Sequence, residues 1–491
     1  MSDVSVVGTG PNGLAAALVM ARAGLSVRVF ETEPTVGGGS RTKELLEPGH
    51  RYDVCSAVHP MALASPFFRR FGLADRIQLT VPDISYAHPL DGGDAGLAYR
   101  DLDRTVQGLG VDGGAFDALM RPLVRRSEAI TDLLMSPLFR AYRQPVAGAF
   151  FGRAALEQGT RLWNRRFSGA RAPALLTGVA AHPVGRMPSL PSAGGGLLLS
   201  LLAHTVGWPI PLGGSQAIAD AMADDVRAHG GELVTGHRIA SLDEVADSRA
   251  VILDVSPSVL LQLGGDRLGP RYARALERFR YGNAACKVDF ILSGPVPWAN
   301  EDVRQAGTVH VGGRREELAA AEAQVAAGRH PEKPYVLLSQ PSSFDPSRAP
   351  AGRHILWTYC HVPAGSTVDM TEAVTAQIER FAPGFRDVVV RSQATTAAEL
   401  ARYNENYVGG DFGGGAVTLA QMLIRPVLAA KPWRTSIPGV YLSSASTPPG
   451  PGVHGMGGLH AAELALKDVF GLPVPDLAPA QGIRPTLSGP G

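Results

Sequence analysis

The hydrophobic positions at the start of the chain predict a strand, a helix and a second strand in close succession. Residues 4–7 are mostly apolar, an alanine-rich run follows residue 13, and residues 26–31 read Ser-Val-Arg-Val-Phe-Glu. Short apolar runs on both sides of a longer apolar run are typical of a βαβ unit. Glycines separate the first strand from the helix, so we expect a tight turn between them.

Alternating helices and strands return twice further along the chain. A helix with an apolar stripe at Ile218, Met222 and Val226 is followed by predicted strands at 232–235, through Ile239 and at 250–254. A strand at 439–444 and a helix at 459–470 are expected near the end. The middle of the chain reads as mixed structure, with strands at 286–292, 335–339 and 354–359 and a helix near 371–381.

Length and composition limit the class of protein. The chain has 491 residues, 45% of them hydrophobic and 19% charged, which predicts two or three globular units rather than one core. The formal net charge of +1 gives no electrostatic reason to expect a nucleic-acid partner. Cys55, Cys286 and Cys360 lie far apart, which argues against a zinc site and dithiol chemistry, and we expect no metal. We find neither a leader sequence nor a long apolar span, and expect a cytoplasmic protein.

The first turn carries the chemistry that the sequence shows most clearly. Gly8, Gly10 and Gly13 are spaced G-x-G-x-x-G between the first strand and the helix, and Glu31 ends the second strand. The glycines permit the turn, the approach of a pyrophosphate and close helix packing, while the helix N-terminus attracts phosphate. An acid at the position of Glu31 accepts hydrogen bonds from a ribose diol and repels a 2′-phosphate. We therefore predict a dinucleotide site; the alternative is a glycine turn in another α/β unit.

A second glycine cluster decides between NAD and FAD. Residues 37–42 read Gly-Gly-Gly-Ser-Arg-Thr, where an NAD domain would continue directly into further βα units. Such a loop can fold over the same pyrophosphate, with Arg41 as the counter-charge. This favours a permanently held FAD, unless Arg41 is an ordinary surface arginine.

A third glycine loop lies near the end of the chain. Gly450, Gly452 and Gly455 again fit G-x-G-x-x-G and precede the last helix. A second nucleotide site is one interpretation, but neither a further strand nor a ribose acid follows. We favour a loop that directs a helix N-terminus at the pyrimidine end of the flavin, where it would stabilise the reduced form.

These motifs predict an α/β protein with a discontinuous, Rossmann-like FAD-binding domain of the glutathione reductase type and an inserted α+β substrate domain. The expected FAD-binding domain comprises residues 1–80, 206–280 and 403–470, the substrate domain comprises 81–205 and 281–402, and 471–491 form a flexible tail. The residues expected to bind the cofactor are Gly8, Gly10, Pro11, Asn12, Gly13, Glu31, Gly38, Gly39, Ser40, Arg41, Thr42, Ile239, Ser446, Gly452, Val453, His454, Gly455 and Met456.

The chain resembles the phytoene desaturase/carotenoid isomerase-like FAD oxidoreductases within the amine oxidase-like flavoprotein superfamily. It is most similar to the pyridine nucleotide-disulfide oxidoreductase domain-containing protein 2-like group. The stretches that carry this resemblance include residues 8–13, 53–60, 207–209, 213–215, 297–298, 348–350, 382–385, 409–411 and 446–456. The resemblance covers nearly the whole chain and implies one non-covalent FAD below a substrate domain. The disulfide chemistry in the group's name is not expected here, because no cysteine pair exists.

Three residues are candidates for catalysis. His454, inside the last glycine loop, is either a base beside the flavin or a packed loop histidine. His59, just before Pro60, is a base or a turn histidine. Lys287 either holds a water at the flavin, as strand lysines do in amine oxidase relatives, or forms a solvated ion pair with Asp289 on the same strand face. Cys55 is more readily a buried small side chain than a covalent flavin attachment.

We expect an FAD-dependent oxidoreductase that abstracts a hydride from a C–H bond of an apolar or secondary-metabolite substrate. The alternatives are a flavin-dependent isomerase that causes no net oxidation and, in another class, a flavin-bearing scaffold protein. The expected partners are this small molecule and an electron acceptor, either oxygen or a quinone. The arginine-rich region 139–171 is interpreted as a solvated face, as a peripheral membrane contact or as the entrance to an apolar tunnel.

Overall fold

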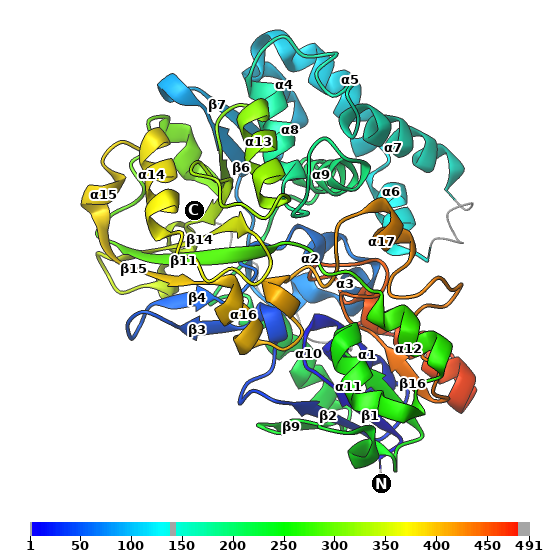
Figure 1. The fold of residues 1–491 in the computed structure, drawn as a ribbon. Coiled ribbons are helices and arrows are strands. Elements are labelled where there is room, and N and C mark those ends of the chain that lie inside the picture. Colours follow the sequence, from blue (N-terminus) through cyan, green and yellow to red (C-terminus); the bar gives the residue numbers. More distant parts are fainter. Residues whose placement is uncertain (1, 138–143, 480–491) are drawn as a thin grey trace.

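A parallel sheet of five strands forms one half of the molecule (Figure 1). The computed structural model describes residues 2–137 and 144–479. The strands of this sheet lie in the order β16 (Val440–Leu442), β10 (Ala250–Leu253), β1 (Val4–Val7), β2 (Val27–Glu31) and β9 (Glu232–Thr235). The sheet therefore joins strands from the beginning, the middle and the end of the chain. Each of the three segments predicted for the nucleotide domain contributes at least one strand, while the domain boundaries themselves stay predictions.

Helices cover both faces of this sheet because its strands are apolar on both sides. Val4 and Val6 of β1 face a core shared with α1 (Pro11–Arg22), α10 (Gln216–Ala228) and α18 (Met456–Ala465). Val7 faces the opposite core, which includes residues of α11 (Pro257–Gly264) and α12 (Pro270–Glu277). The result is a three-layered α/β/α unit, and its parallel strands confirm the expected Rossmann-like fold class.

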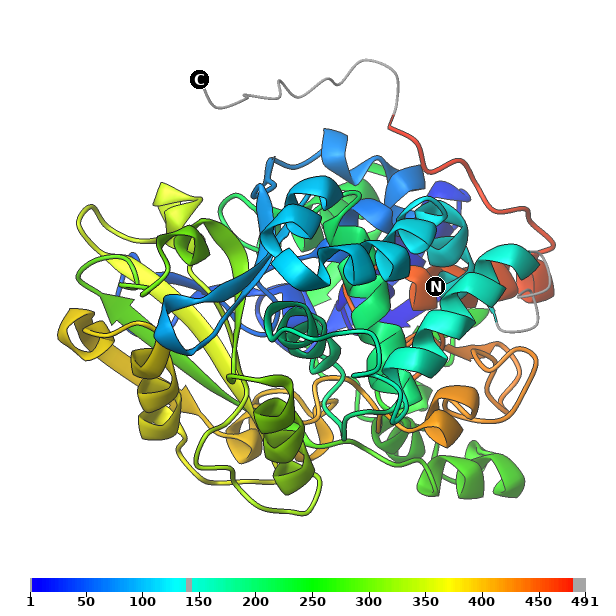
Figure 2. The ribbon, with the colours of Figure 1, turned by 90° about the horizontal axis from the view of Figure 1, so that it is seen from above.

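A second, seven-stranded sheet forms the other half of the molecule, and Figure 2 shows it to one side of the helices α4–α9. Its order is β15 (Val389–Thr395), β11 (Ala284–Leu292), β14 (His354–Val362), β13 (Val336–Ser339), β12 (Ala306–Val311), β6 (Ile84–Pro89) and β7 (Ala95–Tyr99). Its pairs are antiparallel except for β12 and β6. Alternate residues of β14 face opposite sides: Leu356 and Cys360 pack with α14 (Thr371–Phe381), and Trp357 and Tyr359 face an aromatic cluster.

The remaining elements are helices and short strands that connect the two sheets. The helical layer consists of α4 (Leu102–Gly108), α5 (Gly113–Val124), α6 (Ser127–Met135), α7 (Pro145–Gln158), α8 (Arg171–Ala180) and α9 (Leu190–Ala203), and α13 (Arg315–Val325) packs on α8. The short elements are β3 (Thr42–Glu44), β4 (Arg51–Asp53), α2 (Pro60–Ala64), α3 (Pro66–Phe71), β5 (Leu79–Thr80), β8 (Ile210–Pro211), α15 (Phe385–Val388), α16 (Ala397–Tyr403) and α17 (Leu419–Leu423).

Three sequence predictions about elements are corrected. Ile239 lies in no strand, because the chain turns away from the sheet edge at Gly236, whose φ is +69°, and Ile239 is buried below the sheet instead. The last helix begins at Met456 rather than at residue 459. The predicted flexible tail is anchored at 476–478: Leu477 is fully buried, and Arg22 donates hydrogen bonds to Asp476 O and Ala478 O, whereas Gly471, Leu472 and Pro473 are exposed. Residues 480–491 lie outside the described part.

No helix among the described residues is both long enough and apolar enough to cross a membrane. Within the arginine-rich region, Arg140 and Arg143 lie outside the described residues. Arg166 forms an ion pair with Glu157, and Arg171 forms one with Asp94 at 2.6 Å.

Candidate functional site

The first glycine turn brings β1, α1 and the end of β10 into close contact. A Cβ atom added to Gly13 would lie 2.1 Å from Gly8 O, and one added to Gly8 would lie 2.8 Å from Asp254 O. Gly8 has a φ of +95°, a conformation that side chains disfavour. Pro11 and Asn12 begin α1, whose first N–H groups emerge at the turn. The turn therefore has the tight helix–strand packing of a dinucleotide fold.

Asp254, which immediately follows β10, lies beside the same turn. Its Oδ2 accepts a hydrogen bond from Gly13 N at 2.9 Å, and a Cβ atom at Gly10 would lie 2.5 Å from that oxygen. Burial, and to a lesser extent the charge of Glu31, raise the pKa of Asp254 to about 6, although the Gly13 N–H lowers it. A carboxyl group thus occupies one of the donors that a phosphate would use at this helix N-terminus.

Glu31 lies at the end of β2 as the spacing predicts, but its acceptors are engaged within the protein. Oε2 accepts hydrogen bonds from Thr9 N at 3.1 Å and from Thr9 Oγ1. Oε1 accepts one from Glu33 N and lies 2.9 Å from Arg41 Nη2. Each carboxylate oxygen offers about two acceptor sites. A ribose diol bound to Glu31 would therefore replace or share a contact with Thr9 or Arg41.

The second glycine cluster folds directly over the first turn. A Cβ atom added to Gly38 would lie 2.9 Å from Gly10 Cα, so two glycines are needed for this approach. Ser40 is fully buried, and its Oγ has no hydrogen-bond partner. A buried hydroxyl without a partner is costly, and in this position it is available to an external acceptor. Arg41 also donates to Thr35 O and Tyr403 Oη, so it is a buried clamp rather than a surface arginine.

The C-terminal glycine loop lies against the first turn, and Asn12 joins them. Asn12 Oδ1 accepts hydrogen bonds from Gly457 N at 3.1 Å and Gly458 N at 3.4 Å, so the N-termini of α1 and α18 lie side by side. A Cβ atom at Gly458 would lie 1.9 Å from Asn12 O, which shows how closely the two helices pack. Ser446, before this loop, donates to Gly414 O at 2.8 Å.

His454 closes the C-terminal loop with both ring nitrogens. Nε2 lies 3.1 Å from Gly450 O and Nδ1 accepts from Met456 N at 3.0 Å, which together require a neutral ring protonated at Nε2. Burial lowers the pKa of His454 to about 4. The neighbouring glycines allow close packing, since Cβ atoms at Gly452 and Gly455 would meet the Met61 and Phe67 side chains. These contacts suit a residue that shapes the loop, which Val453 also anchors by packing on the core.

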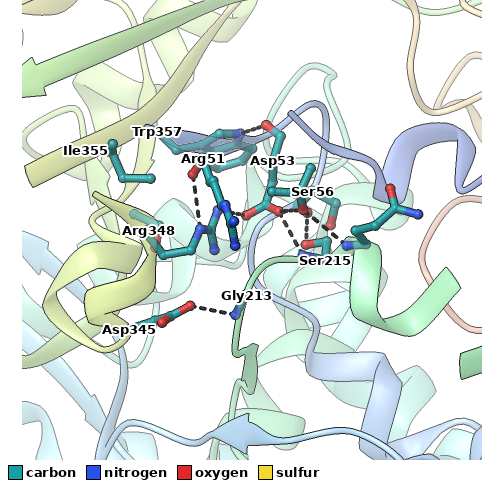
Figure 3. A network of polar contacts seen from close by, with 12 residues as sticks. Arg51, Asp53, Ser56, Gly213, Ser215, Asp345, Arg348, Ile355 and Trp357 are labelled. Atoms are coloured by element: carbon teal, nitrogen blue, oxygen red, sulfur yellow. Dashed lines mark hydrogen bonds and ion pairs between the residues drawn. The ribbon is translucent and has the colours of Figure 1, made fainter. Parts of the chain in front are cut away.

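A buried polar network centred on Asp53 connects the second glycine cluster to the half of the molecule that holds the seven-stranded sheet (Figure 3). Asp53 Oδ1 accepts from Thr42 Oγ1 at 2.7 Å and from Ser215 N at 2.8 Å, and Oδ2 lies 2.6 Å from Arg348 Nη2. Asp53 and Arg348 side chains are fully buried. Trp357 Nε1 donates to Asp53 O at 2.9 Å. The network fixes the loop that follows Thr42 from both halves of the molecule.

His59 belongs to the same network. Its Nε2 lies 2.6 Å from Ser215 Oγ, which in turn donates to Ser56 O, so Nε2 carries the proton. Burial lowers the pKa of His59 to about 4. The proton of this neutral ring is directed at Ser215, which gives His59 a positioning role in this structure.

Lys287 and Asp289 form a buried ion pair, not the solvated pair expected from their alternation on one strand. Their side chains are 6% and 2% exposed, because β11 lies between β14 and β15. Lys287 Nζ lies 5.8 Å from the Tyr52 ring centroid and 6.0 Å from that of Trp357. Burial raises the pKa of Asp289 to about 6 despite the lysine. The lysine is thus held between aromatic rings and a carboxyl group.

An aromatic cluster lies between the second glycine cluster and the seven-stranded sheet. Trp357 and Tyr359 pack edge to face at 5.5 Å, and Tyr359 and Phe412 do so at 5.5 Å. Tyr407 belongs to the cluster, and its Oη would lie 2.7 Å from a Cβ atom at Gly39. Tyr407 also hydrogen-bonds the Cys55 thiol, whose pKa burial raises. The cluster is thus a buried, apolar and aromatic wall that packs against the second glycine cluster.

No group of three or more His, Cys, Asp or Glu side chains in residues 2–137 and 144–479 could hold a metal ion. The donors that the structure gathers are instead backbone N–H groups, the Ser40 hydroxyl and the Arg41 guanidinium. This set suits a diphosphate. Side chains at Gly38 or Gly10 would fill the space where the two glycine loops meet. The residues present therefore fit a dinucleotide.

Comparisons with known proteins agree with this geometry. Residues 6–71 match the model of the NAD(P)-binding Rossmann-like domain. The rat pyridine nucleotide-disulfide oxidoreductase domain-containing protein 2 is 25% identical, over 95% of this chain and 94% of that protein. The resemblance inferred from the sequence is confirmed. The expected enzyme class, an oxidoreductase, is confirmed as well, whereas the substrate stays a prediction.

Two further proteins are similar to this chain, one in fold and one over a short stretch of sequence. Cyclohexylamine oxidase from Brevibacterium oxydans IH-35A shares the fold with a TM-score of 0.55 at 16% identity, over 95% of this chain and 98% of that chain. A limonene dehydrogenase polypeptide of Castellaniella defragrans is 32% identical over 108 residues, which are 22% of this chain and 19% of that protein.

The sequence did not single out Asp254, Tyr407 or the aromatic cluster. Asp254 could have been found, because an acid that ends a strand next to the first strand must lie near the glycine turn. Tyr407 and Phe412 lie in irregular segments whose partners are not predictable from local pattern. Ile239, expected to bind the cofactor, is buried in the core with Val7 and Phe30.

Proposed function

We propose that this protein is an FAD-dependent oxidoreductase that removes a hydride from a C–H bond of a predominantly apolar substrate. The observation that carries the proposal is the junction at Asn12, which holds the N-termini of α1 and α18 together while Gly38 lies on Gly10. Two helix N-termini and three glycine loops meet at this place, and the positive ends of both helix dipoles favour an extended, doubly charged cofactor there.

When bound, FAD would supply the hydride acceptor, and the protein would supply position, charge and exclusion of water. Backbone N–H groups of the first turn, Ser40 and Arg41 would hold the diphosphate. The N-terminus of α18 would lie along the pyrimidine end. The aromatic cluster of Trp357, Tyr359 and Phe412 would hold an apolar substrate, and no described residue of this cluster carries a charge.

No base is assigned among the histidines of the site. His454 and His59 use their ring protons within the protein, and burial lowers the pKa of each to about 4. The Lys287–Asp289 pair remains as the buried ionisable group beside the aromatic surface. We propose that the charges of this pair orient the substrate beside the aromatic cluster. The electrons would pass to oxygen or a quinone.

The test is an absorption spectrum of the purified protein, followed by an anaerobic screen of apolar alcohols, amines and alkenes. We expect flavin absorbance that a substrate bleaches without oxygen. The variant G10A places a methyl group against Asp254 and should lose flavin, whereas G114A, whose Cβ would meet no atom within 4 Å, should retain it. Circular dichroism checks that both variants fold. A protein that takes up NAD but no FAD would refute the cofactor, and product formation without consumption of an acceptor would favour an isomerase.

A further inference from the structure

A buried arginine at the start of α13 lacks an acidic partner. Arg315 is 2% exposed, and its guanidinium donates to Thr177 Oγ1 at 2.7 Å, Pro173 O at 3.2 Å and Trp163 O at 2.6 Å. The fourth close acceptor is Asn164 Oδ1 at 3.1 Å. All of these acceptors are neutral.

No Asp or Glu side chain in the described part of the chain forms an ion pair with Arg315. The residues outside that part, 1, 138–143 and 480–491, contain neither Asp nor Glu in the sequence. Glu316 acts on it only at a distance, and Asn164 links the two residues through a hydrogen bond to Glu316 at 3.2 Å. A buried cation without an anion is costly, which is why such groups are normally paired. Burial accordingly lowers the pKa of Arg315 to about 10.

Part of the guanidinium remains available. Nη2 carries two N–H groups, and its protein contact is Gln158 Oε1 at 3.4 Å. Arg315 and Gln158 line a cavity together with Thr177, Ser189 and Ser192. Arg315 is the charged residue of this lining, and the other lining residues are apolar or neutral. The cavity thus combines one cation with hydroxyl and amide groups.

The size of the cavity limits what it can hold. It contains about 330 Å³ of space between protein atoms, its mouth included, while the centre of a water-sized group can move over about 20 Å³. The centre of one bound water needs at least roughly 10–15 Å³ of such space. The inner part therefore accommodates a compact polar group rather than a whole substrate. A planar carboxylate fits this description and matches the guanidinium geometry.

The cavity borders the aromatic cluster of the seven-stranded sheet. Trp163, Ala180 and Met187 line the cavity, and the same residues pack with Trp357, Tyr359 and Tyr407 in one hydrophobic cluster. Tyr407 reaches Gly39 at the other end. A ligand with a carboxylate at Arg315 would therefore have an aromatic and apolar wall beside its apolar body.

We propose that the cavity at Arg315 binds the carboxylate of an otherwise apolar substrate, and so makes the substrate an amphipathic monocarboxylic acid. That the bound ligand is the substrate rests on the proposed function, whereas the existence of the binding site does not depend on it. The carboxylate would accept a hydrogen bond from Arg315 Nη2 and one from the Ser192 hydroxyl, which would leave its long contact with Arg186 O at 3.5 Å, and would neutralise the buried cation.

Isothermal titration of the purified full-length protein tests the site. The probes are decanoate, methyl decanoate and acetate. We expect decanoate to bind at least tenfold more tightly than its methyl ester and far more tightly than acetate. Equal binding of decanoate and the ester would overturn the inference. Acetate binding as strong as that of decanoate would also overturn it, because the cavity would then be a site for small anions only.

Three variants assign the binding to this cavity. R315Q should weaken decanoate binding roughly 10- to 100-fold, as expected for a charge-assisted bond. Because Arg315 also ties neighbouring segments together, R315Q could fail to fold, so A193L serves as a second variant. Ala193 lines the cavity, and the larger side chain fills it without removing an Arg315 contact. A193L should lose decanoate binding equally, and retained binding there would refute the site.

R161Q removes an exposed arginine of the same region and should leave decanoate binding unchanged. Flavin absorbance is recorded in parallel, so that the two proposals fail separately. Carboxylate-selective binding by a protein that takes up no FAD would overturn the proposed function and leave the site standing. Flavin uptake and substrate bleaching without carboxylate selectivity would leave the function standing and overturn the site.

Discussion

Replacing Asp254 by Asn should make FAD binding tighter and independent of pH near neutrality. The Asp254 carboxyl group accepts the Gly13 N–H at the N-terminus of α1, where a diphosphate would bind. An ionised carboxylate there repels the diphosphate and competes for its donor. An asparagine retains the acceptor, carries no charge and adds an N–H group that a phosphate oxygen can accept.

The pKa of Asp254 gives the size of the effect. Burial, together with Glu31, raises it from 3.8 to about 6, so the ionised form is disfavoured by about 3 kcal/mol in the folded protein. If FAD binds the protonated form, its affinity falls tenfold for each pH unit above about 6. At pH 7.5 the wild-type protein would then bind FAD about 30-fold more weakly than the protonated form does.

The same shift fixes the sign of the stability effect. Because the folded protein holds this proton more tightly than the unfolded chain, the unliganded wild type loses stability as the pH rises from about 4 to 6. D254N should remove this loss and be more stable than the wild type at pH 7. Thermal melts of the apoproteins at pH 5 and 7 measure the difference.

The binding assay is fluorescence titration of apoprotein with FAD between pH 5.5 and 8. We expect log Kd to rise with a slope near 1 above pH 6 in the wild type and to stay flat in D254N. D266N removes an exposed carboxylate nearby in the sequence and should follow the wild type. Parallel pH profiles of wild type and D254N would refute the reasoning, since they would show that Asp254 does not titrate against the cofactor.

Three further predictions concern the cofactor loops and the buried ion pair. S40A removes a hydroxyl without a partner, so we expect an unchanged apoprotein melting temperature and roughly two- to tenfold weaker FAD binding; equal affinity would contradict this. K287M leaves the Asp289 carboxylate buried without its partner and should lower the free energy of unfolding, measured in urea, by about 3–5 kcal/mol. If charge burial causes this loss, the double variant K287M/D289L should largely recover it. Because the pKa of His454 is about 4, its ionisation should not affect the rate of flavin reduction between pH 5.5 and 8. A change of this rate with pH that disappears in H454N would disprove the prediction.

Local pattern was sufficient for the elements around the first turn. The run from Val4 to Glu31 has the strand, glycine and helix signals next to one another, and the structure places β1, α1 and β2 there. Local pattern failed where tertiary packing decides. A strand was expected through Ile239, yet β9 is the edge of the sheet and the chain leaves it at Gly236. The proline-rich stretch at 471–479 looked loose but is held by Arg22.

The candidate site shows the same division between local and distant contacts. Glycine spacing identified the three loops, since each motif lies within a few residues. Their contacts join residues far apart, such as Asn12 with Gly457 and Gly13 with Asp254, which are 445 and 241 positions apart. Lys287 and Asp289 were correctly placed on one strand face, but their burial depends on the neighbouring strands β14 and β15.

The charge balance at the first turn follows only from these distant contacts. Glu31 was predicted to receive a ribose and Arg41 to neutralise a diphosphate, yet the two side chains lie 2.9 Å apart and already neutralise each other. Asp254 then adds a second acid to the same turn. A diphosphate with two negative charges would meet two acids and one arginine, which is unfavourable in a buried site. Protonation of Asp254 removes one of these acids, and it is therefore the step that reconciles an apparently acidic turn with an anionic cofactor.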